Sequence, residues 1–545
     1  MTNTLLTLHD PAAARRYYAD GLWREDTFYT LLQRHTRQRP NTFALRDATR
    51  RMTWAELLTA VDAVAADLDH AGLKRGERVA IWLPNRVEAV IVFLACSRNG
   101  YVCNPSLHQN YTVAEIVGLL ERTNAAALFA QPGYGADAKT ADIFAATAAL
   151  PSLRKIYSLG DGPAAPFPTE PGLLPVTETN PDAVVYLAFT SGTTGIPKGV
   201  MHSANTLLAN ARAMVEDWRH DSSTILLSLS PLSHHIAAVA IAQALAAGME
   251  LVVNSPPPRK TPLDWIVETG ATYVMGVPTH AMDILGEMRR RGLTKLGRVK
   301  TFYMAGSPIP REVAQAFLDR GVTPQNVYGM SENSSHQYTL PSDSPETIVA
   351  TCGKACAAYE IRLWDQENPD HEVAPGEVGE IGGRGACLML GYFDNQRATE
   401  DSFNRSGWFM SGDLGRFDPH GNLEIVGRKK DLIIRGGHNI HPSKIEDLTM
   451  RHKAVARCAA FAVADPRLGE KVCLSVIFHE GESADPDTIL AHLNAEGLSR
   501  YDMPEYFIRM DAYPLTASGK ILKRELVEWA KSGRIAPTPV RWSGG

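Results

Sequence analysis

Four short segments of the chain carry residue types suited to binding a nucleotide. The first, residues 190–199, reads TSGTTGIPKG, with three glycines, four hydroxyl side chains and one lysine. Backbone N–H groups around glycine can close on an anion because no Cβ blocks the approach, and lysine adds a compact positive charge. The order differs from the G-x-x-x-x-G-K-S/T loop, because Lys198 follows a proline and precedes a glycine. The segment predicts a phosphate-binding loop of another type; taken alone, it is also compatible with a surface turn.

The second and third segments could bind the base, the metal and the sugar. Residues 326–332, NVYGMSE, place Tyr328 where its ring could stack on a base, and Glu332 where it could hold Mg²⁺ together with phosphate oxygens. Residues 408–413, WFMSGD, place Asp413 after a tight turn, where a carboxylate can accept both ribose hydroxyls. Each signal is weak alone, since a tyrosine at a strand end is common in cores and a turn aspartate is commonly solvated.

The fourth segment, residues 514–520, reads PLTASGK and places Lys520 on a glycine-containing turn. A lysine in such a turn is unremarkable by composition. It gains significance only if the end of the chain folds over the phosphate loop.

The elements around these segments predict an α/β fold. Residues 53–73 have apolar side chains at helical spacing, residues 78–83 read as a buried strand, and residues 87–96 read as the next helix. This alternation is typical of mostly parallel sheets flanked by helices. A further buried strand, residues 184–189, runs directly into the phosphate loop. The loop therefore lies at the carboxyl end of a strand, where open α/β sheets bind ligands.

The chain changes character near residue 430. A charged stop at residues 428–431 follows an extended segment at residues 422–426, and the elements beyond it are short. We predict two domains, residues 1–429 and residues 430–545, the second being a small α+β domain of ordinary size. Its expected elements are a strand at 432–434, a helix at 442–450, a strand at 472–478 and a helix at 486–495.

Composition excludes several classes of protein. The 545 residues contain 55 Lys and Arg against 60 Asp and Glu, a net charge of −5, which gives no reason to expect a nucleic-acid partner. The most apolar long stretch, residues 236–253, is interrupted by Gln243 and Glu250, so it predicts a buried helix and strand rather than a membrane span. No secretion signal is evident at the start, and seven scattered cysteines fit a reducing compartment. We expect a cytoplasmic protein.

Taken in order, the motifs resemble the adenylate-forming superfamily of acyl-CoA synthetases, luciferases and peptide-synthetase adenylation domains. The resemblance runs from about Phe28 to Leu526. It rests on TSGTTGIPKG, AGSP (305–308), YGMSE, SGDLG, GRKKD, GGHNIHP and PLTASGK. It implies a large N-terminal adenylation core of mixed, mostly parallel sheets with a distorted β-barrel subdomain. It also implies a small mobile C-terminal domain.

The resemblance implies an AMP-forming acid–thiol ligase that uses ATP, Mg²⁺ and coenzyme A. A carboxylate would attack the α-phosphorus to give an acyl-adenylate and pyrophosphate, and a thiol would then displace AMP. Catalysis would consist of positioning and of placing positive charge between anions. The implied catalytic residues are Lys520, Glu332 and His234, with Glu332 also binding the metal.

The same resemblance assigns the nucleotide-binding residues. The phosphates would be held by Thr190, Ser191, Gly192, Thr193, Thr194, Gly195, Lys198 and Ser331. Adenine and ribose would be held by Gly306, Ser307, Tyr328, Gly329, Asp413 and Arg428.

Further implied roles concern domain motion, CoA and regulation. Lys430 falls at the family hinge, and Gly436 and Gly437 would line the tunnel for the pantetheine arm, where glycine permits close approach. Acylation of Lys520 by a lysine acetyltransferase, reversed by a deacetylase, would remove its charge. A homodimer is a further expectation. Asp502 stands where the family often has a lysine, which weakens a cationic contact to the CoA phosphate there.

The acyl pocket is expected to be lined by His234, His235, Ile236, Val327, Gly329 and Met330. These residues suggest an apolar wall with imidazole at the mouth. The bulky pair His234-His235, in SPLSHHIA, does not suggest an open tunnel for long chains. We therefore favour a compact alicyclic or medium-chain acid of the cyclohexanecarboxylate type, with aryl acids such as benzoate as the alternative.

Other functions fit the residues less well. An amino-acid adenylation domain typically has an aspartate just after the gating segment, where this chain has His235 and Ile236. A luciferase-type oxygenase is a minority use of the fold, and a P-loop kinase would need a different loop. A non-catalytic adenine-nucleotide sensor need not keep both Lys520 and Glu332.

Overall fold

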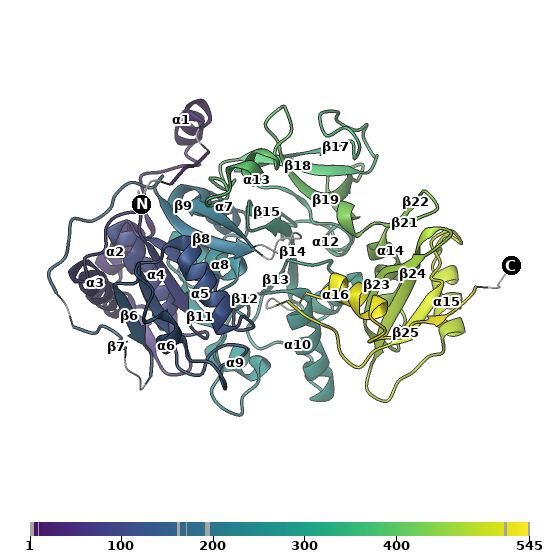
Figure 1. Ribbon diagram of the computed structural model, residues 1–545, viewed down its shortest axis with the longest axis horizontal. Helices are drawn as coiled ribbons and strands as arrows, with labels where there is room; N and C mark the ends of the chain where they lie inside the picture. Colours follow the sequence, from purple (N-terminus) through teal and green to yellow (C-terminus); the bar gives the residue numbers. More distant parts are fainter. Residues whose placement is uncertain are drawn as a thin grey trace.

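The computed structural model describes residues 5–8, 10–160, 164–170, 172–190, 197–516 and 520–542. Two large sheets with helices between and around them form the N-terminal part, and a smaller C-terminal part lies beside them (Figure 1). This architecture confirms the predicted fold class. No helix in the described ranges is both long and apolar enough to cross a membrane.

The first large sheet has seven strands in the order β7-β6-β5-β3-β4-β8-β9. All neighbours are parallel except β8 and β9, which are antiparallel. The bounds are β3 (Arg78–Trp82), β4 (Val102–Asn104), β5 (Ala127–Ala130), β6 (Lys155–Ser158), β7 (Ala165–Pro166), β8 (Val184–Thr190) and β9 (Lys198–Ser203). The strands predicted at residues 78–83 and 184–189 are confirmed.

The second large sheet has nine strands in the order β16-β15-β14-β13-β12-β10-β11-β1-β2. The strands from β14 to β1 are parallel, and antiparallel strands extend both edges. The bounds are β1 (Phe43–Arg46), β2 (Arg51–Thr53), β10 (Ile225–Ser228), β11 (Glu250–Val253), β12 (Tyr273–Gly276), β13 (Thr301–Met304), β14 (Thr323–Met330), β15 (Ser334–Tyr338) and β16 (Lys354–Ala355).

Two helices between these sheets, α4 (Val87–Asn99) and α8 (His235–Ala247), form the centre of the core. Every residue of α4 is buried, as are the first eleven residues of α8. With β11, α8 confirms that the apolar stretch of residues 236–253 is a buried helix and strand. The helix α3 (Trp54–His70) begins at a capping box, in which Thr53 and Glu56 satisfy each other's backbone N–H groups.

The remaining helices cover the outer faces of the sheets and the C-terminal part. They are α1 (Pro11–Ala19), α2 (Phe28–Gln38), α5 (Val113–Thr123), α6 (Ile143–Thr147), α7 (Ala204–Asp217), α9 (Pro262–Thr269), α10 (Pro278–Arg290), α11 (Arg311–Leu318), α12 (Pro345–Ala350), α13 (Gln396–Glu400), α14 (Pro442–Met450), α15 (Pro486–Ala495) and α16 (Lys523–Lys531).

The β subdomain of the N-terminal part is a four-stranded antiparallel sheet in the order β17-β18-β19-β20. Its strands are β17 (Tyr359–Trp364), β18 (Gly379–Gly385), β19 (Phe409–Phe417) and β20 (Leu423–Arg428). A short 3-10 helix, η1 (Lys429–Asp431), then leads into the C-terminal part. The exact boundary at residues 429 and 430 stays a prediction.

The C-terminal part is built on a six-stranded sheet in the order β22-β21-β24-β25-β26, with β23 also pairing β24. The bounds are β21 (Ile433–Arg435), β22 (His438–Ile440), β23 (Val455–Asp465), β24 (Gly469–Phe478), β25 (Tyr506–Arg509) and β26 (Thr538–Pro539). The predicted helices at 442–450 and 486–495 are confirmed as α14 and α15. The predicted strand at 472–478 begins three residues earlier, because β23 pairs with it as far as Gly469.

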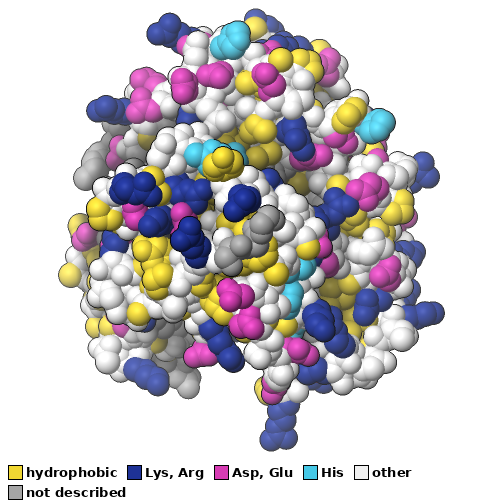
Figure 2. Space-filling model, turned by 90° about the vertical axis from the view of Figure 1, so that its right-hand side faces the viewer, with side chains coloured by type: hydrophobic (Ala, Val, Ile, Leu, Met, Phe, Trp, Pro, Cys, Tyr) yellow, Lys and Arg dark blue, Asp and Glu magenta, His cyan; other side chains and the backbone are white. Residues whose placement is uncertain are grey.

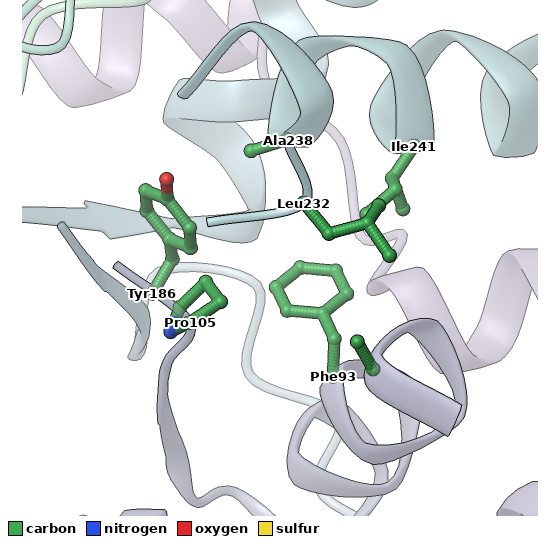
Figure 3. A pocket seen from close by; sticks show the side chains of 7 residues that line it. Phe93, Pro105, Tyr186, Leu232, Ala238 and Ile241 are labelled. Atoms are coloured by element: carbon green, nitrogen blue, oxygen red, sulfur yellow. The ribbon is translucent and has the colours of Figure 1, made fainter. Parts of the chain in front are cut away.

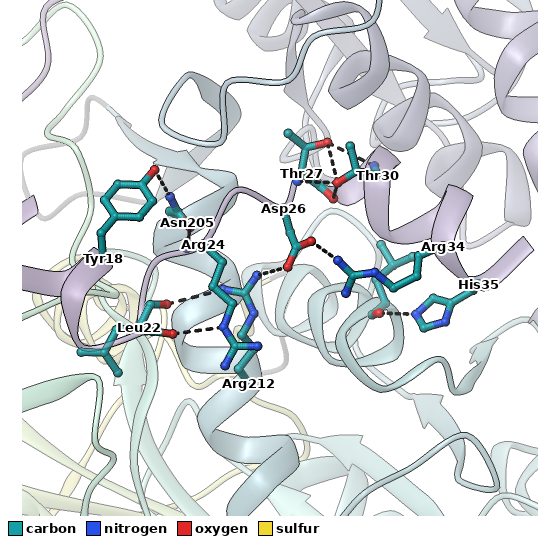
Figure 4. A network of polar contacts seen from close by, with 12 residues as sticks. Tyr18, Leu22, Arg24, Asp26, Thr27, Thr30, Arg34, His35, Asn205 and Arg212 are labelled. Atoms are coloured by element: carbon teal, nitrogen blue, oxygen red, sulfur yellow. Dashed lines mark hydrogen bonds and ion pairs between the residues drawn. The ribbon is translucent and has the colours of Figure 1, made fainter. Parts of the chain in front are cut away.

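The segment between α1 and α2 is tied to α7 by a polar network (Figure 4). The carboxylate of Asp26 pairs with Arg34 on α2 and, at 3.2 Å, with Arg212 on α7. Asn205 on α7 accepts a hydrogen bond from the Arg24 backbone N–H at 2.9 Å. Burial lowers the pKa of Arg212 to about 10, although Asp26 offsets part of this effect. The network fixes α7, whose opposite side reaches the interior near β15.

Among the described residues, two ion pairs connect the C-terminal part to the N-terminal part. Arg457 on β23 lies 3.1 Å from Asp283 on α10, and Arg451 after α14 lies 3.7 Å from Glu312 on α11. Both pairs are partly exposed, and such pairs contribute roughly 0.2–1 kcal/mol each. They bias the arrangement of the two parts without locking it.

Replacing Arg457 by alanine is expected to expose the connection at residues 428–431 more often. Loss of an ion pair of this size corresponds to an increase of up to about fivefold in the opened population. Trypsin cleavage at these basic residues, under conditions in which the rate follows that population, measures it. Arg467→Ala removes an exposed arginine of the same domain as a control, and the exchange Arg457→Asp with Asp283→Arg should restore slow cleavage. Equal cleavage rates in all four proteins would contradict the role of this pair.

Candidate active site

The described motif residues converge where the nine-stranded sheet, the β subdomain and the C-terminal part meet. Tyr328 lies near the end of β14, Asp413 on β19 and Arg428 at the end of β20. The Tyr328 hydroxyl donates to Asp413 Oδ2 at 3.1 Å, and Arg428 Nε lies 2.9 Å from Asp413 Oδ1. Three residues predicted from separate motifs to bind adenine and ribose are therefore in direct contact.

Lys520 reaches into this region from the C-terminal part. A methyl group added at Gly306, in the segment after β13, would lie 3.3 Å from Lys520 Cε. Gly306 also has φ +95°, a left-handed conformation that favours glycine. Ser307 follows it and is partly buried. The lysine side chain thus lies against the predicted adenine-binding segment.

The electrostatic setting of Lys520 is unusual for a lysine. Burial lowers its pKa to about 8, and the charge of Arg428 adds to the effect. Asp413 and Glu332 act in the opposite direction but do not cancel it. A cation held in this way is stabilised by an arriving anion.

Glu332 follows β14 and offers one carboxylate at the edge of the site. Its Oε1 accepts a hydrogen bond from the Tyr392 hydroxyl at 2.8 Å. Burial raises its pKa, and the Tyr392 hydrogen bond and the charge of Lys198 offset part of this shift. Within the described residues, no group of three or more His, Cys, Asp or Glu side chains could hold a metal by itself. Among the described residues, only Oε1 of this carboxylate is hydrogen-bonded to another side chain. A carboxylate with one oxygen available fits Mg²⁺, which proteins commonly hold through one or two carboxylates and substrate phosphates.

The ends of the predicted phosphate loop lie in the seven-stranded sheet. Thr190 ends β8 and Lys198 begins β9, and the two are register partners. Lys198 Nζ lies 4.7 Å from the centre of the Tyr392 ring. Ser331 places its backbone carbonyl 2.6 Å from His202 Nε2. The predicted residues Ser191, Gly192, Thr193, Thr194 and Gly195 lie outside the described residues.

His234 caps the N-terminus of α8. Its Nδ1 accepts the backbone N–H of Ile236 at 3.3 Å, so the neutral ring carries its hydrogen on Nε2. Burial and then the charge of Lys520 lower its pKa to about 3. The side chain is thus a neutral hydrogen-bond donor near Lys520. It is not set up as a general base.

The neighbouring histidine corrects the picture of two imidazoles at the pocket mouth. His235 is buried, and its Nε2 lies 3.1 Å from the hydroxyl of Ser334, at the start of β15. Its ring stacks on His202 with centroids 5.4 Å apart. Because residue 235 is already inside the helix, its side chain turns toward β15, whereas the cap residue His234 remains half-buried.

Glycine at 329 is required by a close approach of the backbone. A Cβ at this position would lie 1.8 Å from the carbonyl oxygen of Ser334. Ser334 itself has φ +56°, which is uncommon for a residue other than glycine. The tight turn between β14 and β15 brings Met330, Ser331 and Glu332 to the edge of the site.

The interior below this turn is more polar than the apolar wall expected from the sequence. The Tyr303 hydroxyl and Ser335 Oγ lie 2.7 Å apart, and Asn210 on α7 exchanges two hydrogen bonds with the Ser335 backbone, at 2.8 and 3.1 Å. Tyr303 packs in the same core as Val327 and Ile236. His235 Nδ1 is buried without a hydrogen-bond partner among the described residues. Polar side chains therefore stand directly behind the predicted acyl-pocket residues.

A cavity between α4 and α8 lies next to this region (Figure 3). Its volume is about 10 Å³, and Phe93, Leu232 and Tyr186 are among its lining residues. Such a cavity has room for about one water molecule. It is too small to be the acyl pocket itself.

The structure does not bring the predicted CoA-tunnel residues to the site. Gly436 and Gly437, with φ +58° and +87°, form the turn between β21 and β22, which lie in the C-terminal part on the right of Figure 1. Nearby, Asp502 pairs with His438 at 2.9 Å and with Lys444 at 3.6 Å. Figure 2 shows Lys and Arg side chains spread over this side of the molecule, with acidic side chains between them.

A family model described as "AMP-binding enzyme" matches residues 32–393, and one described as "AMP-binding enzyme C-terminal domain" matches residues 444–520. The chain belongs to the AMP-binding enzyme family. It is 33% identical over 495 residues to feruloyl-CoA synthase of Amycolatopsis sp, covering 90% of this chain and 97% of that protein. It is 29% identical over 519 residues to the medium-chain fatty-acid–CoA ligase of Escherichia coli (strain K12), covering 93% and 91%.

A solved structure agrees with this assignment. ATP-bound MatB from Rhodopseudomonas palustris superimposes with a TM-score of 0.81 at 27% identity, covering 93% of this chain and 100% of that one. This AMP-binding enzyme is an AMP-forming acyl-CoA synthetase, an acid–thiol ligase that uses ATP, Mg²⁺ and CoA, as the sequence predicts. The roles of its individual residues stay predictions.

The sequence did not reveal several residues that surround the predicted ones. Tyr392 contacts both Lys198 and Glu332, yet it lies in the apolar run LMLGYF, which reads as core. His202 supports the Ser331 turn, and Ser335 and Asn210 form the polar interior. A glycine before Tyr392 was the one local signal of a special backbone position, with φ +113° at Gly391.

The pKa of Lys520 generates a pH prediction for the AMP-binding enzyme. The ammonium form exists below about pH 8 and is lost above it, so acid-dependent pyrophosphate release should fall as pH rises through this value. The kcat/KM for ATP reports the free enzyme and is the quantity to measure. In Lys520→Arg, whose side chain stays charged, any remaining activity should lack this decline. A decline that persists unchanged in the arginine variant would assign it to another group.

Proposed function

We propose that this enzyme ligates CoA to a compact ring carboxylic acid that carries a hydrogen-bonding substituent. The observation that carries the proposal is the polar interior behind the predicted acyl pocket, formed by His235, Ser334, Tyr303 and Ser335. These side chains are hydrogen-bonded in pairs, but His235 Nδ1 is buried without a partner among the described residues. An unpaired buried polar group costs about 1–3 kcal/mol, so a substrate that pairs with it is favoured.

In the first half-reaction, an oxygen of the substrate carboxylate attacks the α-phosphorus of ATP and pyrophosphate leaves. The residues of this chain position the two anions and offset their charge. Tyr328 and Asp413 would bind adenine and ribose, with Gly306, Ser307, Gly329 and Arg428 beside them. Thr190, Lys198 and Ser331 would hold the phosphates. Glu332 would hold Mg²⁺, which when bound supplies positive charge between phosphate oxygens.

Lys520 would lie between the attacking carboxylate and the α-phosphate. Its location beside Gly306, with Asp413 and Glu332 near enough to act on its charge, supports this role. It also argues against a non-catalytic sensor, which has no need of a lysine brought in from a second domain. His234, as a neutral donor on Nε2, would hydrogen-bond the acyl carboxylate.

In the second half-reaction, the CoA sulfur attacks the acyl carbon, AMP leaves and the thiol proton is lost to solvent. Gly436 and Gly437 would line the CoA path only after residues 430–545 rotate about Lys430. Acylation of Lys520 would silence the first half-reaction by removing its charge. We place the enzyme in the cytoplasm, where CoA and ATP are available.

The substrate class separates into two candidates. An unsubstituted alicyclic acid such as cyclohexanecarboxylate would leave His235 Nδ1 unpaired. Aryl acids with oxygen substituents would pair with it, and the similarity to feruloyl-CoA synthase supports this class. A long aliphatic chain cannot hydrogen-bond to these polar side chains and gains no affinity from them.

Lys520→Ala should separate the two half-reactions. Loss of a charge that acts in the transition state typically costs about 10²–10³ in rate, so acid-dependent pyrophosphate release should fall by that factor. Thioester formation from supplied acyl-adenylate and CoA should stay close to wild type, because Lys520 has no part in it. Both rates are measured in single turnovers. An equal loss in both half-reactions would contradict the division of roles.

An acid panel tests the substrate class. AMP release is measured with ATP, CoA and 4-hydroxybenzoate, benzoate, cyclohexanecarboxylate and octanoate. The hydroxylated acid, 4-hydroxybenzoate, should have the highest kcat/KM. Tyr303→Phe should reduce that kcat/KM by about 3- to 10-fold, the effect of losing one hydrogen bond. The kcat/KM for cyclohexanecarboxylate should be unaffected by that change and serves as the internal control. A preference for octanoate would contradict the substrate class, and no acid-dependent AMP at all would contradict the ligase.

A further inference from the structure

The segment from Met389 to Phe393 joins the strand after the phosphate loop to the turn that carries Glu332. Met389 N–H donates to the Glu332 carbonyl at 2.7 Å. Along β9, Leu390 N–H donates to the Met201 carbonyl at 2.8 Å and Phe393 N–H to the Gly199 carbonyl at 2.6 Å. The backbone of this segment therefore fixes the distance between Lys198, at the start of β9, and Glu332.

The side chain of Tyr392, in the middle of this segment, contacts both charged residues. Its hydroxyl donates to Glu332 Oε1 at 2.8 Å, and its ring lies 4.7 Å from Lys198 Nζ. The side chain is 6% exposed, and its own backbone N–H is bonded to Thr399 Oγ1 at 2.9 Å. Tyr392 is thus held rigidly while it contacts an anion with its hydroxyl and a cation with its ring face.

These contacts have different consequences for the two charges. A hydrogen bond to Oε1 fixes the rotation of the carboxylate and leaves Oε2 for another partner. The ring face attracts the ammonium without occupying its three N–H donors, which stay available for phosphate oxygens. Without the tyrosine, Glu332 and Lys198 would be free to pair with each other and close the space between them.

We propose that Tyr392 is a positioning residue that keeps Glu332 open for Mg²⁺ and Lys198 open for the ATP phosphates. The inference rests on the proposed function, because those two residues are nucleotide-binding residues only in that reaction. Nothing in the proposed mechanism requires Tyr392 itself to touch a substrate.

Two substitutions separate positioning from packing. Tyr392 packs against Val200, Met389 and Phe409, so a large apolar replacement keeps this cluster filled. Tyr392→Phe removes the hydroxyl and keeps the ring under Lys198. Tyr392→Leu removes both contacts.

The test is a binding cycle that needs no turnover. The Kd of ATP is measured by calorimetry in the absence of any carboxylic acid, once with excess Mg²⁺ and once with EDTA. The Kd in EDTA divided by the Kd with Mg²⁺ is the gain in ATP affinity that the metal provides. In Tyr392→Phe the gain should fall roughly tenfold, the typical effect of a hydrogen bond to a charged group, while the Kd in EDTA stays within about twofold. In Tyr392→Leu the Kd in EDTA should also rise, by about 2- to 5-fold, because the contact to Lys198 is lost.

Tyr157→Phe is the matched control. Tyr157 is a buried tyrosine whose hydroxyl donates to the Asp67 carboxylate at 2.7 Å, in the seven-stranded sheet. The Tyr157→Phe variant should lose thermal stability, as Tyr392→Phe does, and should keep the wild-type gain in ATP affinity from Mg²⁺. The proposal would be overturned if Tyr392→Phe kept the wild-type gain in ATP affinity from Mg²⁺, or if both phenylalanine variants lost the same share of that gain. Because no acid is present, failure of the ligase assay would leave this result unaffected and would count against the proposed function alone.

Discussion

The arrangement of the two parts depends on the buried charge of Lys520. The lysine comes from the C-terminal part but lies against Gly306 of the N-terminal part, in a place where burial and Arg428 weaken its ammonium form. Bringing an anion to this place stabilises the charge, and stabilising the charge favours the docked arrangement. Nucleotide binding and docking are therefore linked, and each must strengthen the other.

The N-terminal part supplies a rigid counterpart to that charge. Asp413 is fixed by Tyr328 from one sheet and Arg428 from another strand of its own sheet, so it cannot turn to neutralise Lys520 completely. Glu332 is likewise engaged by Tyr392. The carboxylates near the lysine are held by other donors, which leaves part of its charge for the substrate. This arrangement suits a reaction that joins two anions.

The sequence predicted the elements whose signals are local. Helices at 442–450 and 486–495 begin with a proline and show a regular apolar spacing, and both agree with the structure. The helix predicted at 87–96 extends to Asn99, because only Gly100, with φ +73°, ends it. Tyr328 and Arg428 lie at or near the ends of β14 and β20, and both contact Asp413 in the middle of β19.

The sequence alone did not predict the contacts between residues that are far apart in the chain. Tyr392 lies in an apolar run, and only the pairing of its segment with β9 brings it between Lys198 and Glu332. The direction of His235 depends on where α8 begins, a matter of one residue, because His234 is the cap. The polar interior could not be foreseen because Ser335 and Asn210 meet only through the packing of α7 against β15. Tyr392 and Glu332 are 60 residues apart in the sequence, and Asn210 and Ser335 are 125 apart.

The positions of Lys520 and the Gly436-Gly437 turn carry a final consequence for the order of events. Both belong to the part of the chain built on the β21–β26 sheet, yet Lys520 lies against Gly306 of the N-terminal part while the turn is formed by β21 and β22 at one edge of that sheet. A sheet of this size moves as one body, so it cannot present both to the same site at once. If the turn serves CoA, the lysine must leave when CoA arrives. The ion pairs Arg457–Asp283 and Arg451–Glu312 are then broken at every turnover, and their modest strength is a requirement of the cycle.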